Sequence, residues 1–108
     1  MKVKKNKKII AKKVCDCKGW KSLIGLRFKK SFNPYDAYLI HLLPDSVIDT
    51  FFVSLKFTAV WLDKNYKVLK VQDCTKNKFY APVKNQYLVL ELPNNKCLRK
   101  GNKLQILK

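Results

Sequence analysis

The stretch FTAVWLDKNYKVLKVQ, residues 57–72, decides the fold class. It contains two apolar runs, Phe57–Leu62 and Tyr66–Gln72, on either side of the turn-forming residues 63–65. Short apolar runs joined by such residues are typical of a β-hairpin, and Asn65 is a residue that accepts a positive φ. The stretch therefore predicts two antiparallel strands.

The rest of the chain repeats this pattern of short apolar runs separated by turn residues. Four further strands are predicted from it, at Ile9–Val14, Ala37–Leu43, Tyr87–Leu92 and Leu104–Leu107. We expect an all-β (mainly β) domain, a compact sandwich or barrel of six to eight short strands.

One short helix is expected near residues 18–29. Apolar side chains recur there at helical spacing on one face, namely Trp20, Leu23, Ile24 and Phe28. Arg27 lies at the edge of this stripe, where its stem can pack while its guanidinium reaches a partner. The helix is predicted to close one end of the β structure.

The length of the chain fits one domain. With 108 residues it can bury a single core. We expect residues 1–8 to be a basic N-terminal tail, and residues 9–108 to form a single β-rich domain. We also expect a monomer.

The charge of the chain is strongly basic, with 24 Lys and Arg, 7 Asp and Glu, and a net charge of +17. Only Arg27 and Arg99 are arginines. Lysine acts as a point charge, so the excess favours nonspecific attraction to polyanions over reading of a base sequence. The candidate nucleic-acid contacts are Lys4, Lys5, Lys7, Lys8, Lys12 and Lys13. The alternative is a lysine-rich composition that maintains solubility.

Targeting signals and cysteine usage suggest a cytoplasmic protein. No signal-peptide core and no transmembrane run stands in the sequence. Cys15 and Cys17 would place two sulfurs on one side of an extended strand, and a zinc site would need Cys74 and Cys97 to converge with them. Free thiols, a thiolate metal site and a disulfide are the three interpretations. No metal and no cofactor is predicted.

Several short motifs follow one another along residues 9–108. They are Gly25-Leu26-x-Phe28-Lys29, Asp49-Thr50-Phe51-Phe52-Val53, Val60-Trp61-Leu62-Asp63, Leu90-Glu91-Leu92-Pro93 and Gly101-Asn102-Lys103-Leu104. Their order and spacing resemble the prokaryotic domain-of-unknown-function 192 family. The resemblance implies a small β-sandwich or barrel and no assigned reaction. The chain departs from the family pattern by having Arg27 in place of Met, Lys29 in place of Arg, and Asn95 in place of a turn glycine.

Glu91 is the only glutamate and the centre of the predicted site. It alternates with Leu90 and Leu92, so it shares a strand face with Val89. A half-buried carboxylate needs a partner. Arg27 or Lys29 is the candidate, because the family resemblance implies a basic residue near there. The predicted ligand-contacting residues are Arg27, Lys29 and Glu91, with Asp49 and Thr50 at the rim.

No catalytic residue is predicted. His41 is the only histidine, so it is expected to be a satisfied core or edge residue rather than a metal ligand. The predicted function is a non-enzymatic binding or accessory module whose ligand the sequence does not name. The alternatives are a nucleic-acid-associated protein that uses the lysine-rich residues 1–30, and an enzyme whose motifs are too divergent to recognise.

Overall fold

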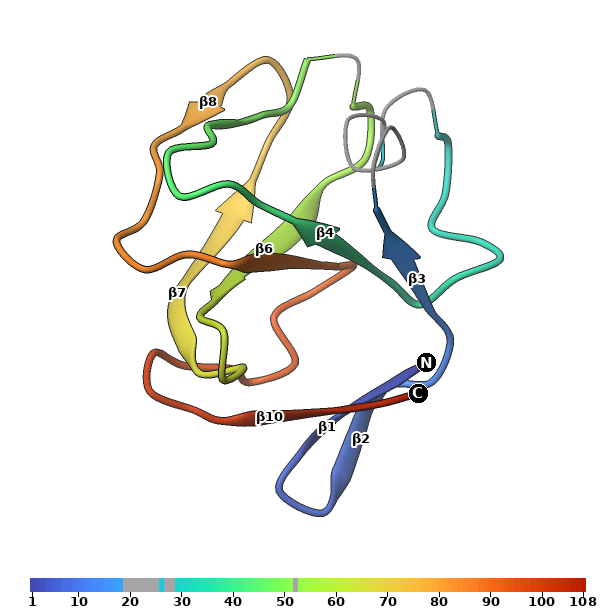
Figure 1. Cartoon of the computed structure of the whole chain (residues 1–108). Coiled ribbons are helices and arrows are strands. Elements are labelled where there is room, and N and C mark those ends of the chain that lie inside the picture. Colours follow the sequence, from blue (N-terminus) through green and yellow to red (C-terminus); the bar gives the residue numbers. More distant parts are fainter. Residues whose placement is uncertain (19–25, 27–28, 52) are drawn as a thin grey trace.

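Ten short strands and no helix are found in the computed structural model, which describes residues 1–18, 26, 29–51 and 53–108 (Figure 1). The all-β class is therefore confirmed. Eight strands have four or more residues, and β5 (Ile48–Asp49) and β8 (Phe79–Tyr80) have two each. The helix expected near residues 18–29 falls mainly on positions outside the described residues. No helix in the described part is long and apolar enough to cross a membrane.

The larger sheet contains five strands. Their order is β3 (Val14–Cys17), β4 (Ala37–His41), β9 (Leu88–Leu92), β6 (Phe57–Leu62) and β7 (Val68–Cys74). Among the four strand pairs of this sheet, β3–β4 is parallel and the others are antiparallel. Every residue of β6 and β9 is buried, because both faces of this sheet are covered. This explains why these strands appear in the sequence as nearly continuous apolar runs.

The β6–β7 hairpin lies where residues 57–72 predict it. The positive φ falls on Tyr66 (65°), however, so the expectation for Asn65 was wrong. The Asp63 carboxylate accepts hydrogen bonds from the backbone N–H groups of Asn65 (2.8 Å) and Lys67 (3.0 Å). The turn is closed by a bond from Tyr66 N to Asp63 O (3.0 Å). This geometry is a turn followed by one left-handed residue.

A three-stranded sheet packs beside the larger one, in the order β10 (Leu104–Leu107), β1 (Lys2–Lys5) and β2 (Lys8–Ala11). Residues 1–8, expected to be a tail, thus contain β1 and the first residue of β2. The physical reason is Val3, which is fully buried and anchors a strand that is otherwise lysine. The register pairs Lys2 with Leu107, which places the two chain ends side by side (Figure 1).

Two hydrophobic clusters cover the two faces of the larger sheet. The first lies between the two sheets and joins Leu39, Val60 and Leu90 to Val3 and Leu104. The second lies on the other face, under the long connecting segments. Its members include Cys17, Leu26, Tyr38, Ile40, Trp61, Cys74 and Val89. The predicted site residue Glu91 belongs to this second face.

Candidate functional site

Glu91 is a buried carboxylate near the middle of the five-stranded sheet. Glu91 as a whole is 7% exposed to solvent. In the register it stands directly opposite Tyr38 of β4 and Ala59 of β6. Directly opposite residues project from the same face of a sheet, so Glu91 lies on the face of β9 that carries Val89. The leucines on either side of Glu91 belong to the other core.

Lys29 lies close to the ring of Tyr38, the residue paired with Glu91 in the register. Its Nζ atom is 5.5 Å from the ring centroid of Tyr38, within cation–π range. Its backbone is held by a bond from Lys29 N to Leu26 O (3.2 Å) and by Ser54 Oγ, which donates to Lys29 O (2.9 Å). Tyr38 thus adjoins both Lys29 and Glu91. Arg27 lies outside the described residues, so its pairing with Glu91 stays a prediction.

Asp49 and Thr50 lie beside β8. Asp49 pairs with Phe79 in the small β5–β8 sheet, and its carboxylate accepts a hydrogen bond from Phe51 N (3.3 Å). Thr50 is fully buried. Its hydroxyl donates to Thr75 O (2.6 Å) and accepts from Lys78 N (2.8 Å). Thr50 therefore holds the loop between β7 and β8.

Two buried thiols of this face, Cys17 and Cys74, are weaker acids than an ordinary thiol. Burial raises the pKa of Cys17 to about 12, helped by its hydrogen bond with Cys15 and by negative charge nearby that includes Glu91. Burial also raises the pKa of Cys74 to about 11. Cys97 is exposed on a distant turn. Within the described ranges, no group of three or more His, Cys, Asp or Glu side chains is arranged to hold a metal ion.

The β1–β2 hairpin carries most of the lysines expected to contact polyanions. Its turn contains Asn6, whose φ is 56°. Lys5 Nζ donates to the backbone oxygen of Cys97 (3.0 Å), which ties the hairpin to the turn after β9. Between the hairpin and this turn lies a pocket of about 560 Å³. Its lining consists of Lys5, Asn6, Lys7, Lys8, Ile10, Lys96 and Cys97.

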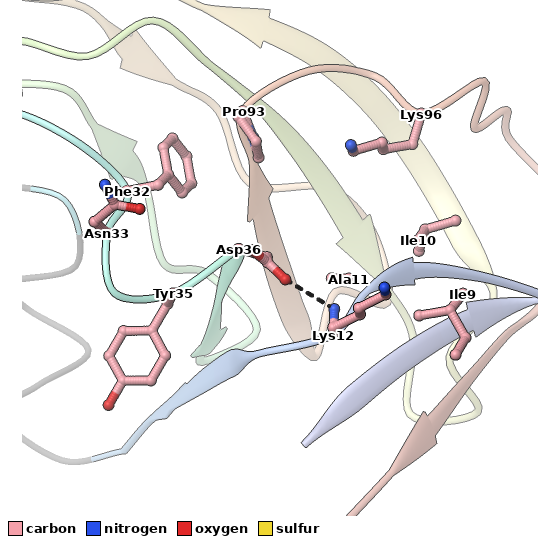
Figure 2. Close-up of a pocket in the computed structure, with 10 residues that line it drawn as sticks. All are labelled: Ile9, Ile10, Ala11, Lys12, Phe32, Asn33, Tyr35, Asp36, Pro93 and Lys96. Atoms are coloured by element: carbon pink, nitrogen blue, oxygen red, sulfur yellow. Dashed lines mark hydrogen bonds between the residues drawn. The ribbon is translucent and has the colours of Figure 1, made fainter.

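A second pocket, of about 430 Å³, adjoins the first and shares Ile10 and Lys96 with it. Figure 2 shows the rings of Phe32 and Tyr35 on one side of this pocket and Ile9 and Ile10 on the other. Between them lies Asp36. Its carboxylate oxygen Oδ2 accepts hydrogen bonds from the backbone N–H groups of residues 12 and 13, both at 3.1 Å.

The turn that carries Lys96 differs from the expected one. The residues with a positive φ are Lys96 (55°) and Cys97 (60°). Asn95, which stands where the family pattern has a turn glycine, does not have a positive φ. Asn95 acts through its side chain instead, because its Oδ1 accepts a hydrogen bond from Leu98 N (2.6 Å). This side-chain bond closes the turn and holds Lys96 at the junction of the two pockets.

A histidine–carboxylate pair was missed by sequence reasoning. His41 Nε2 lies 2.7 Å from Asp16 Oδ1, and Asp16 also lies 3.6 Å from Lys18 Nζ. The parallel pairing of β3 and β4 brings these residues together, although 25 positions separate His41 from Asp16. A pocket of about 220 Å³ adjoins the pair and includes Tyr66 and Tyr87. Among the described residues, its lining has no Ser, Thr or Cys, so the side chains there that could act as nucleophiles are those of Lys and Tyr.

Comparison with known proteins shows similarity of fold. No family model matches the chain, and no curated protein matches it in sequence. A protein of unknown function from Novosphingobium aromaticivorans DSM 12444 has a similar structure, with a TM-score of 0.72, 10% identity, and coverage of 86% of this chain and 72% of that one. A candidate transcription regulator from Sinorhizobium meliloti 1021 is also similar, with a TM-score of 0.69, 11% identity, and coverage of 85% and 78%. The chain is thus a small β-domain whose fold resembles those of uncharacterised bacterial proteins.

Proposed function

We propose that the chain is a non-enzymatic binding module and a divergent relative of the domain-of-unknown-function 192 family. The motif order supports this relationship, because motifs quoted for it fall on strands β6 and β9 and on the turn before β10. The fold is a small all-β structure of three sheets, in line with the small β-sandwich or barrel that the resemblance implies. The similarity to two bacterial β proteins agrees with this proposal.

The ligand that the geometry supports best is a polyanion. The main support for a polyanion is the pair of adjoining pockets at the β1–β2 hairpin. Their linings include five lysines: Lys5, Lys7, Lys8, Lys12 and Lys96. Asp36 is the one acidic residue in these linings as far as the structure describes them, and it already accepts two backbone hydrogen bonds. A concave surface of one charge sign concentrates its counter-ion and raises the rate of association.

Nucleic acid is the polyanion we propose. Lysines give phosphate contacts without reading bases, so binding should be nonspecific in sequence. The rings of Phe32 and Tyr35 lie beside the basic pockets and offer apolar surface to unstacked bases. The description of the Sinorhizobium protein as a candidate transcription regulator is in line with this class of partner.

Fluorescence anisotropy with a labelled single-stranded oligonucleotide tests the proposal. The variant is Lys7→Gln/Lys8→Gln/Lys12→Gln, which neutralises three exposed lysines of the pockets. The matched control is Lys76→Gln/Lys78→Gln/Lys84→Gln, which removes the same charge from exposed positions in the loops flanking β8. Those loops lie at the other end of the molecule from the β1–β2 hairpin (Figure 1).

The two triple variants should differ in the salt dependence of binding. If the three pocket lysines contact phosphates, the slope of log affinity against log salt should fall in magnitude by about 2, at about 0.7 per contact for single strands. The control should keep most of the slope. Equal losses in both variants would show that overall charge, not the pockets, attracts the ligand. Absence of binding at low salt would end the proposal.

An enzymatic function is the second candidate, supported by the Asp16–His41 pair beside a pocket. A carboxylate-held imidazole is a general acid–base group. The test is a panel of small ester and phosphoester substrates assayed with the protein and with His41→Asn. Equal background rates for the two proteins would remove this candidate.

We further propose that the protein is cytoplasmic and monomeric, as its composition and size suggest. Light scattering across a range of concentrations tests the oligomeric state, and a mass that rises with concentration contradicts it.

A further inference from the structure

Two cysteines of β3 form a close pair of thiols. Cys15 and Cys17 are two residues apart in an extended strand, so their side chains project from the same face. Their Sγ atoms are 3.5 Å apart, and Cys17 Sγ lies 3.7 Å from the backbone oxygen of Cys15. In the described part of the chain, no other two cysteine sulfurs are in contact. The pair therefore has a geometry that Cys74 and Cys97 lack.

A covalent bond between the two sulfurs requires the strand to contract at this point. Two residues of an extended strand span about 6.6 Å, at the upper end of the range of about 4.4–6.8 Å between Cα atoms in disulfides, and the Cβ atoms on one face keep about that separation, whereas a disulfide holds them about 3.5–4.5 Å apart. The sulfurs need to approach each other by about 1.5 Å to reach bonding distance. β3 is an edge strand that pairs only with β4 among the described strands, so extra twist in it disturbs one neighbour.

The two thiols differ in their access to solvent. Cys15 is partly exposed, whereas Cys17 is buried. We propose that Cys15 and Cys17 form a thiol–disulfide exchange site that reacts with small disulfides of the glutathione type and closes to an intrachain disulfide. The proposal is independent of polyanion binding, since it uses β3 and not the β1–β2 hairpin.

The reaction has two exchange steps. First, the Cys15 thiol loses its proton to water and its sulfur attacks one sulfur of oxidised glutathione. A mixed disulfide forms at Cys15, and one glutathione leaves as a thiolate that takes up a proton. Second, Cys17 loses its proton and attacks the Cys15 sulfur, which releases the second glutathione. In total, two protein thiols are oxidised and one glutathione disulfide is reduced to two thiols.

Burial affects the rate of the second step. Because burial raises the pKa of the Cys17 thiol, its reactive thiolate is scarce near neutral pH. The mixed disulfide at Cys15 should therefore accumulate before the ring closes. Closure should become faster as the pH rises toward the pKa of Cys17.

The test uses the full chain carrying Cys97→Ser, because Cys97 is exposed and would react by itself. The protein is incubated with oxidised glutathione, quenched by alkylation and mapped by mass spectrometry of its peptides. We expect a Cys15–Cys17 disulfide, seen as the loss of two hydrogen atoms in the peptide. The added variant Cys17→Ser should stop at glutathione on Cys15. The added variant Cys15→Ser should leave Cys17 free.

The buried Cys74 is an internal reference for global unfolding. Its thiol should be lost at least about tenfold more slowly than that of Cys15, because reactivity requires exposure and thiolate character. Two outcomes overturn the proposal. One is a Cys15 thiol that stays free while Cys97 of the unsubstituted protein reacts. The other is a mixed disulfide at Cys15 that never closes, even at alkaline pH, giving the same product with and without Cys17.

Discussion

Replacement of Gln86 by glutamate should destabilise the domain strongly, because this buried amide joins two loops. Gln86 is 4% exposed. Its Nε2 donates to Leu43 O (2.7 Å) and to Ser46 O (3.0 Å), and its Oε1 accepts from Val83 N (2.9 Å). Three backbone groups from residues 43–46 and 83–86 thus depend on one side chain. Glutamate keeps its shape and one acceptor but loses both donors.

The magnitude follows from the two carbonyl groups that lose their donor. A buried polar group left unsatisfied costs about 1–3 kcal/mol, so two carbonyls give a loss of about 2–6 kcal/mol. Repulsion between the new carboxylate and the two carbonyl oxygens adds to this loss. Domains of this size are stable by about 5–15 kcal/mol, so the variant should be at or near the limit of folding.

Urea denaturation followed by tryptophan fluorescence measures the effect. The control is Gln105→Glu, the same chemical change at an exposed position of β10 opposite Lys4, where we expect a change within about 0.5 kcal/mol. Acid provides a second readout, since the introduced carboxyl group, once protonated, can donate to one carbonyl again. The folded pKa of this group should lie above the unfolded value of about 4.3, so the lost stability should return in part as the pH falls through that folded pKa.

Equal urea midpoints of Gln86→Glu and Gln105→Glu at neutral pH would contradict this prediction. So would a Gln86→Glu variant that recovers no stability in acid relative to the unsubstituted protein. Either result would mean that the amide does not join the two loops.

Three further predictions concern stability. Thr50→Val should cost about 1–3 kcal/mol in urea denaturation, because the N–H of Lys78 and the carbonyl of Thr75 lose their hydroxyl partner, and water can replace part of the loss at these two exposed residues; an unchanged midpoint contradicts this. Burial raises the pKa of Cys74 to about 11 and that of Cys17 to about 12, so the two neutral thiols contribute stability that is fully present below pH 9.0 and is lost as the pH rises through those folded values. Stability should therefore fall there by about 1.4 kcal/mol per pH unit for each thiol, and Cys74→Ala should reduce that slope. Added salt should raise the melting temperature, because it screens the repulsion within a chain of net charge +17.

The strands with clear apolar runs were predictable from the sequence. β6 and β10 have the predicted bounds, and β9 begins one residue later than expected. β1 was not predictable in this way, because its sequence Lys2–Lys5 contains a single apolar residue that faces the core. β5 and β8 have two residues each and depend on pairing with one another, so no local pattern indicates them.

The placement of the site residues depends on contacts distant in sequence. Alternation along β9 was enough to assign Glu91 to one face. The contact of His41 with Asp16 required knowledge that β3 and β4 are parallel neighbours, which local patterns do not give. Likewise, the lysines of residues 1–12 were recognisable as a charged segment. Their arrangement around two pockets depends on Lys96, more than eighty positions away.

The charge arrangement of the β1–β2 hairpin connects its stability to its proposed role. Lys5 and Lys8 stand directly opposite each other in the register, and like charges in that position weaken a sheet. The hairpin is stabilised by its own buried side chains Val3 and Ile10 and by the hydrogen bond that Lys5 donates to the backbone oxygen of Cys97. An anion bound between these lysines would remove the repulsion, so binding and folding should reinforce each other. Salt then acts in opposite directions on the two properties: it stabilises the free protein by screening and weakens the complex by competing for the lysines.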